Sequence, residues 1–76
     1  MPYTAEIVEE LNILARYNLD STQEGLKIHS SAEPSVIAAT QRLFDKGLIS
    51  QVDGGYLSSL GLSAAEHGQK LLQILG

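Results

Sequence analysis

The stretch LFDKGLISQVDGGYLSSLG, residues 43–61, decides the fold because it contains a helix end, a short hairpin and a helix start. A lysine followed by a glycine ends the first of these helices, since a cation suits the negative end of the helix dipole and glycine accepts a positive φ. Two short strand-forming runs flank the turn residues DGG, which predicts a hairpin over residues 48–57. Ser58 is the expected N-cap of a last helix over residues 59–75.

Two registers are possible for this hairpin. A loop made of the two glycines pairs Val52 with Leu57. A turn made of the aspartate and the first glycine would instead pair Gln51 with Tyr56. The first register is favoured because it buries an apolar cross-strand pair.

The beginning of the chain predicts a first helix over residues 5–17. Thr4 is a suitable N-cap, and glutamates follow in the first turns, where carboxylates favour the positive end of the helix dipole. Ile13 and Tyr17, four residues apart, form a narrow stripe to the side of the main apolar face. That face recurs at helical spacing and consists of Ile7, Val8, Leu11, Leu14 and Ala15.

Two further helices are predicted before the hairpin. Ser21 and Glu24 have the spacing of a capping box, which predicts a short helix over residues 22–29. Pro34 suits the first position of a helix over residues 34–46, where no backbone N–H is needed. The inner side of that helix is expected to comprise Val36, Ile37, Ala39, Thr40, Leu43 and Phe44.

The last helix carries one broad apolar face, which leaves Leu62 and Ile74 outside it. The face consists of Leu60, Ala64, Gly68, Leu71, Leu72 and Leu75. Gly68, in the middle of the helix, suggests a tight helix crossing. No linker or repeat divides the sequence, so residues 1–76 are predicted to form a single domain that is mainly α with a small β-hairpin.

Composition limits the possible partners. The net charge is −4, from 9 acidic and 5 basic side chains, and the resulting field opposes the approach of DNA phosphates. There is no cysteine, no signal-peptide pattern at the N-terminus and no apolar run near the roughly 20 residues that span a bilayer. A cytoplasmic protein without membrane contact is expected.

The order helix, helix, turn, helix, hairpin, helix resembles the winged helix-turn-helix superfamily. Many such regulators end the third helix with KGLI and return from the wing into Y-x-L-T-x-x-G. Ser58 stands where threonine is usual, and one residue is missing between Tyr56 and Leu57. The matching residues are Leu43, Lys46, Gly47, Leu48, Ile49, Tyr56, Leu57, Ser58 and Gly61. The whole chain also resembles a family of short uncharacterised bacterial proteins with a presumed DNA-binding fold.

Two features depart from the pattern of this superfamily. The strand that often lies between the first and second helices has no room in YNLDST, residues 17–22. The wing is short, at about ten residues, and it carries Asp53 rather than a cation at its tip. The departure argues against contact between the wing and phosphates.

The resemblance implies a transcription-associated protein that reads duplex DNA with its third helix. Candidate contacts to bases and phosphates are Ser35, Ala38, Gln41, Arg42 and Lys46. Glu33 and Asp45 share that side of the helix and would repel phosphate.

The alternative is a homodimer or an adaptor that binds another protein without nucleic acid. This alternative is based on apolar residues that lie outside the main apolar faces of the helices, namely Ile13, Tyr17, Leu62 and Ile74. In winged-helix regulators the terminal helices commonly pair subunits, so the resemblance is compatible with this reading.

Catalysis, a cofactor and a metal site are not expected. His29 and His67 are the only histidines, and they lack cysteines or clustered carboxylates at zinc-ligand spacing. Neither GxxxxGK nor GxGxxG occurs, so DGG is a hairpin turn and not a phosphate-binding loop.

Overall fold

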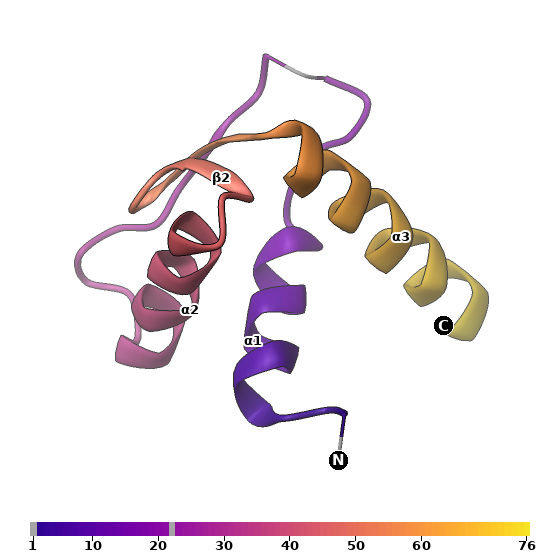
Figure 1. The fold of residues 1–76 in the computed structure, drawn as a ribbon, viewed down its shortest axis with the longest axis horizontal. Helices are drawn as coiled ribbons and strands as arrows, with labels where there is room; N and C mark the ends of the chain where they lie inside the picture. Colours follow the sequence, from indigo (N-terminus) through magenta and orange to yellow (C-terminus); the bar gives the residue numbers. More distant parts are fainter. Residues whose placement is uncertain (1, 22) are drawn as a thin grey trace.

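The computed structural model of the chain describes residues 2–21 and 23–76. The elements in chain order are α1 (Ala5–Leu14), β1 (Leu26–Lys27), α2 (Pro34–Asp45), β2 (Ile49–Gln51), β3 (Gly54–Leu57) and α3 (Ser59–Leu75). The three helices lie beside one another with α1 in the middle, and the hairpin follows directly on α2 (Figure 1). This arrangement is flat, with extents of 33 × 33 × 20 Å.

The expectation of a mainly helical chain with a small hairpin is confirmed. The helices expected over residues 34–46 and 59–75 form almost as predicted. Thr4 caps α1, its hydroxyl accepting a hydrogen bond from the Ile7 N–H at 3.1 Å. However, α1 ends three residues earlier than predicted, and tight turns carry the chain from Leu14 to Tyr17.

The predicted helix over residues 22–29 is wrong for residues 23–29, while residue 22 lies outside the described part of the chain. The Asn18 side chain explains the loss of the capping box. Its amide donates to the Glu24 carboxylate at 3.1 Å, so the glutamate is engaged elsewhere. Its carbonyl oxygen accepts from the Asp20 N–H at 3.0 Å, a local turn of the kind that competes with helix.

The strand β1 occupies part of the segment expected to be helical and extends the hairpin to three antiparallel strands in the order β1-β3-β2. Leu26 lies opposite Gly55, and Lys27 lies opposite Gly54. A Cβ atom at Gly54, where φ is +131°, would lie 2.2 Å from the Leu26 carbonyl oxygen, so glycine permits this close pairing. A strand therefore does follow α1, but it lies after residues 17–22, the segment that was expected to leave no room for one.

Both expected hairpin registers are wrong. The turn residues are Val52 and Asp53, and the ladder is irregular because a bulge interrupts it. At this bulge the Tyr56 N–H donates to the Ser50 hydroxyl at 2.9 Å. The observed Cα partners are Ile49 with Leu57 and Gln51 with Gly54. Val52 is exposed, so burial of an apolar pair did not determine the register.

Ser58 joins the end of α2 to the start of α3. Its hydroxyl donates to the Gly47 carbonyl at 2.6 Å and accepts from the Gly61 N–H at 3.1 Å. Its own N–H donates to the Leu48 carbonyl at 3.0 Å. The KGLI segment and the YLSSLG segment are thus in contact through these hydrogen bonds. Ser58 is confirmed as the N-cap of α3.

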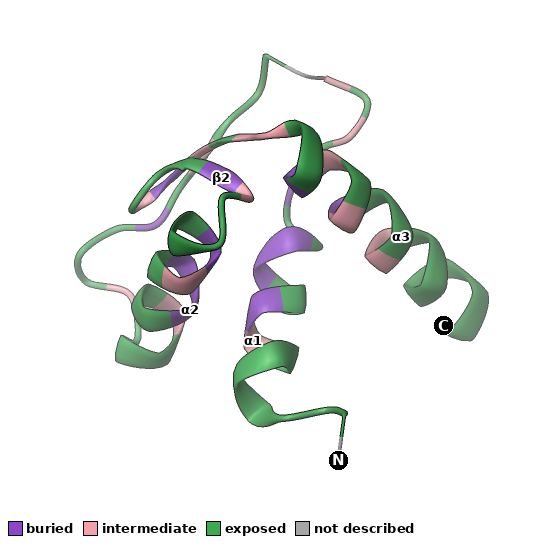
Figure 2. Cartoon of the chain, viewed as in Figure 1, coloured by how far each residue is buried: buried purple, intermediate pink, exposed green. Residues whose placement is uncertain are grey.

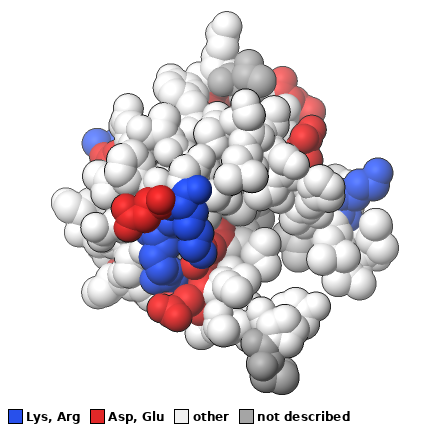
Figure 3. Space-filling view, viewed as in Figure 1, with Lys and Arg blue, Asp and Glu red and all other residues white. Residues whose placement is uncertain are grey.

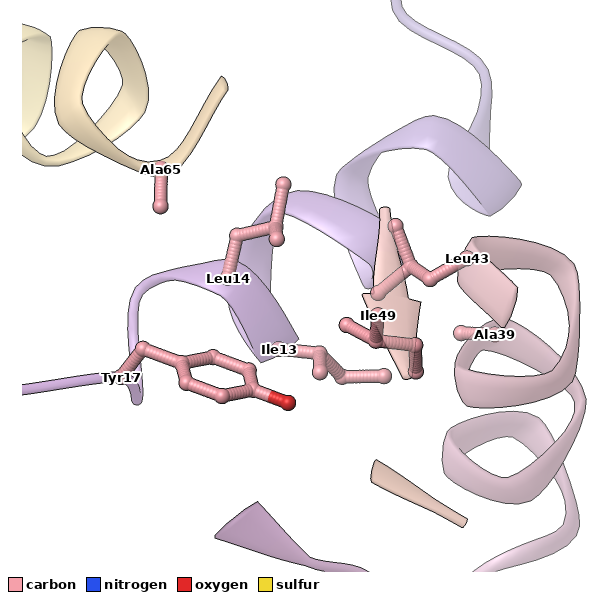
Figure 4. Close-up of a cluster of buried hydrophobic side chains, with 7 residues drawn as sticks. All are labelled: Ile13, Leu14, Tyr17, Ala39, Leu43, Ile49 and Ala65. Atoms are coloured by element: carbon pink, nitrogen blue, oxygen red, sulfur yellow. The ribbon is translucent and has the colours of Figure 1, made fainter. Parts of the chain in front are cut away.

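The core lies where α1 packs against α2, the hairpin and the beginning of α3 (Figures 2 and 4). The Tyr17 hydroxyl donates to the Gly55 carbonyl at 3.2 Å, and burial raises the pKa of Tyr17. Gln69 of α3 donates to the Leu14 and Tyr17 carbonyls at 3.1 and 2.8 Å, which satisfies the end of α1. The clustered side chains are Ile13, Leu14, Tyr17, Ala39, Leu43, Ile49 and Ala65.

This core corrects the predicted helix faces. The narrow stripe of Ile13 and Tyr17 is buried, whereas most of the main apolar face of α1 is exposed. On α2, Ile37 and Phe44 are exposed rather than on the inner side. Each helix is therefore turned about its axis relative to the expectation.

None of the helices in residues 2–21 and 23–76 has the length and apolar character that crossing a bilayer requires.

Candidate functional surfaces

The side of α2 that was predicted to contact DNA bases is free at its N-terminal half. Ser35, Ala38 and Gln41 are all exposed. Gln41 and Ile37 border a groove of about 390 Å³ between α2, the segment after β1 and the β2–β3 turn. These three predicted contacts therefore lie where a partner could reach them.

The two predicted cationic contacts, Arg42 and Lys46, face α1 instead. Arg42 Nε donates to Glu10 Oε2 at 2.9 Å, and Lys46 Nζ pairs with Glu10 Oε1. The Arg42 guanidinium also lies 3.6 Å from the Glu9 carboxylate and 3.9 Å from that of Glu6. We call these five residues the Glu10 cluster. It holds α1 against α2 and neutralises both cations of α2.

Glu10 is the buried member of this cluster. Burial alone would raise the pKa of Glu10, but hydrogen bonds from Lys46 and Arg42 and the charges of both outweigh it, so the pKa of Glu10 is lowered. The hydrogen bond to Glu10 in turn raises the pKa of Arg42. Figure 3 shows basic side chains bordered by acidic ones, not a continuous positive face.

Glu10 is not among the residues predicted from the sequence, although two features of the sequence point to it. Glu10 precedes Ile13 and Tyr17 by three and seven residues, so it continues their stripe by one helical turn. A carboxylate on a buried stripe needs a cationic partner. Arg42 and Lys46, four residues apart on one side of a helix, can supply one cation to each carboxylate oxygen.

Replacing Glu10 by glutamine is expected to remove a pH-dependent part of the stability. Because the folded pKa of Glu10 is lowered, its contribution is complete above the ordinary glutamate pKa of about 4.3 and is lost as pH falls through the folded value. Glu10→Gln should therefore lower the Tm at pH 7, and the difference from wild type should shrink on acidification. Thermal melts from neutral to acidic pH test this, with Glu33→Gln as the control on an exposed residue. A Tm difference that stays constant with pH would contradict it.

Exposed apolar side chains gather on α1 and α3, at the end of the molecule away from the hairpin. We call them the α1–α3 apolar surface: Ile7, Val8, Leu11, Leu71, Leu72 and Leu75. All six belong to the apolar faces predicted for these helices. The helices still meet at Gly68, where a Cβ atom would lie 3.6 Å from Leu11 Cδ2. Beyond that point they diverge, and Figure 3 shows an uncharged, hollowed surface there (Figures 1 and 3).

The predicted interface residues occupy quite different places. Ile13 and Tyr17 are in the core, so the expectation that they form a surplus apolar stripe is wrong. Leu62 is half-buried and borders a small cavity beside Tyr17. Ile74 is 71% exposed and lines a shallow pocket together with Leu71, so it lies at the edge of the α1–α3 apolar surface.

A metal site would draw on the two histidines and the carboxylates. Among the described residues, no three histidine, aspartate or glutamate side chains come together as such a site. His67 Nδ1 lies 2.6 Å from the Ser63 carbonyl oxygen, one turn earlier on the same helix, so this ring nitrogen is engaged locally.

Comparison with known proteins gives a family but no function. A family of unknown function (DUF5669) matches over residues 1–76. Neither the curated proteins nor the solved structures gave a match.

Proposed function

Since the chain belongs to a family of unknown function (DUF5669), its role has to be inferred from its own surfaces, and we propose that it is a protein-interaction module. The binding surface is the α1–α3 apolar surface. One observation carries this proposal: apolar side chains of two amphipathic helices are exposed together, with no other part of the described chain covering them. Contiguous exposed apolar patches of this kind commonly mark protein-binding sites.

The Glu10 cluster argues against nucleic acid as the main partner. Affinity for DNA comes largely from cations that replace counterions at phosphates. On α2 those cations are Arg42 and Lys46, and both are paired with carboxylates of α1. A phosphate would have to displace Glu10 and approach Glu6 and Glu9, in a chain whose net charge is already −4.

Binding of duplex DNA is the second candidate, and a specific observation favours it. Ser35, Ala38 and Gln41 are exposed along one side of α2, and the hairpin follows that helix as a wing would. The likeness to winged-helix proteins is reduced, however, because β1 stands where the second helix of a helix-turn-helix was expected, and only α2 and the hairpin keep the expected order. This role would depend on hydrogen bonds and apolar contacts to bases more than on phosphate contacts.

Site-specific photo-crosslinking in cells distinguishes the two candidates. A benzophenone amino acid replaces Leu72 in the α1–α3 apolar surface or Ser35 on the free side of α2. We expect protein adducts from position 72, and protein adducts there without DNA adducts from position 35 support the interaction module. Position 35 serves as a matched helical surface control, because Ser35 is also exposed.

Each other outcome has a definite meaning. DNA adducts from position 35 would favour the second candidate. Absence of protein adducts from position 72, under conditions where the variant is folded and the crosslinker reacts with added apolar peptide, would overturn the proposed function.

A further inference from the structure

We propose that the partner of the α1–α3 apolar surface is a second copy of this chain, so that the protein is a homodimer. This inference rests on the proposed function and adds the identity of the partner. In a twofold-symmetric dimer the same surface on both copies forms the interface, so α1 and α3 of each copy would pack on α1 and α3 of the other.

The accessible surface of the chain is larger than the average for a folded monomer of its mass. It measures 5290 Å². A folded monomer of 8.2 kDa is expected to expose about 4,500 Å². The excess of roughly 750 Å² is close to the ~800 Å² that each partner contributes to a stable interface of standard size. Burial of one such patch per chain would bring the exposed area to the ordinary value.

The charge distribution favours an uncharged partner surface, such as that of a second copy, over a charged one. The six residues of the α1–α3 apolar surface are all uncharged, and the charged side chains of Glu66 and Lys70 come near it beside Leu71. A charged partner surface would lose hydration there without gaining an ion pair. A second copy presents an equally uncharged apolar surface of the same size.

The distribution of apolar residues points in the same direction. Only eight hydrophobic residues are buried among those described, two of them alanines, while thirteen large hydrophobic residues are exposed. Chains below roughly 80 residues often lack a sufficient core and gain stability from disulfides, metals or oligomerisation. This sequence has no cysteine, and no metal site forms among the described residues. Of these three sources of stability, oligomerisation is the one that the thirteen exposed residues favour.

Sedimentation equilibrium of the purified chain over a concentration series tests the inference. Wild type should show a mass near twice 8.2 kDa. Leu72→Lys places a charge from each copy in the interface and should raise the dimer dissociation constant at least roughly a hundredfold. Gln73→Lys is the matched control: it adds the same charge at the next residue, at an exposed position on the other side of α3, and should leave the constant within about threefold.

A wild-type monomer at every soluble concentration would overturn the inference, as would equal dissociation by the two substitutions. If the Leu72→Lys monomer does not fold, the wild-type Tm decides, because it must rise with protein concentration for a dimer and stay constant for a monomer. If the chain is a monomer in solution but forms adducts with other proteins from position 72, the homodimer proposal is wrong and the proposed interaction module is retained. Absence of any adduct would remove both.

Discussion

Gly61→Ala is expected to destabilise the fold by about 3 kcal/mol or more, the upper range for overpacking. A Cβ atom at Gly61 would lie 1.9 Å from the carbonyl oxygen of Leu48 and 2.8 Å from its carbon. Both atoms belong to the backbone, and the oxygen accepts a hydrogen bond from the Ser58 N–H, so they cannot move without breaking the junction between the hairpin and α3. Thermal melting monitored by circular dichroism should show a Tm lower by roughly 10–20 °C.

Gly68→Ala provides the matched control in the same helix. A Cβ atom there would meet only Leu11 Cδ2, at an ordinary 3.6 Å. The alanine should leave the Tm unchanged or raise it, because it gains up to about 1 kcal/mol of helix propensity over glycine. An equal decrease in Tm for both variants would contradict the prediction, because it would show that the contact with Leu48 is not the reason why Gly61 is required. The expectation of a tight crossing at Gly68 is thus replaced by a tight contact at Gly61.

Leu43→Ala is expected to destabilise the fold by about 2–5 kcal/mol, because it leaves a cavity in the middle of the core. Leu43 is 1% exposed and is the largest fully buried side chain of the described residues. It lies between α1 and the hairpin, so few neighbours can move in to fill the space (Figure 4). Urea unfolding measures the loss, and Leu60→Ala, at an exposed position of α3, should change stability by less than about 0.5 kcal/mol. Similar losses for the two variants would contradict the assigned core.

The starts of the three helices that form and the end of α2 were predictable because their signals are local, whereas the end of α1 was not. Thr4 and Ser58 bond to N–H groups three residues away, and Pro34 and Gly47 impose their own backbone geometry. The segment around Leu26 was not predictable in this way, since β1 exists only through pairing with the glycines of β3. In retrospect, the alternation of apolar and polar residues in LKIH indicates a strand better than a helix.

The functional surfaces were predicted in part. The apolar faces of α1 and α3 follow from periodicity, but periodicity does not say whether the same chain covers them. For Arg42 and Lys46, the resemblance implied a partner outside the molecule, whereas Glu10 supplies one within it. Whether these two cations pair with Glu10 or stay free for a phosphate depends on how α1 is turned about its axis. The burial of Ile13 and Tyr17 fixes that orientation.

The hydrogen bonds from Gln69 to Leu14 and Tyr17 span 55 and 52 residues of sequence. The carboxyl end of α1 therefore lacks these partners until most of the chain has left the ribosome. Pairings this distant in sequence slow folding, because closing a long loop costs conformational entropy before the contact that offsets this cost can form. The carboxyl end of α1 is thus secured only when α3 is available, although the Glu10 cluster can already join the rest of the helix to α2.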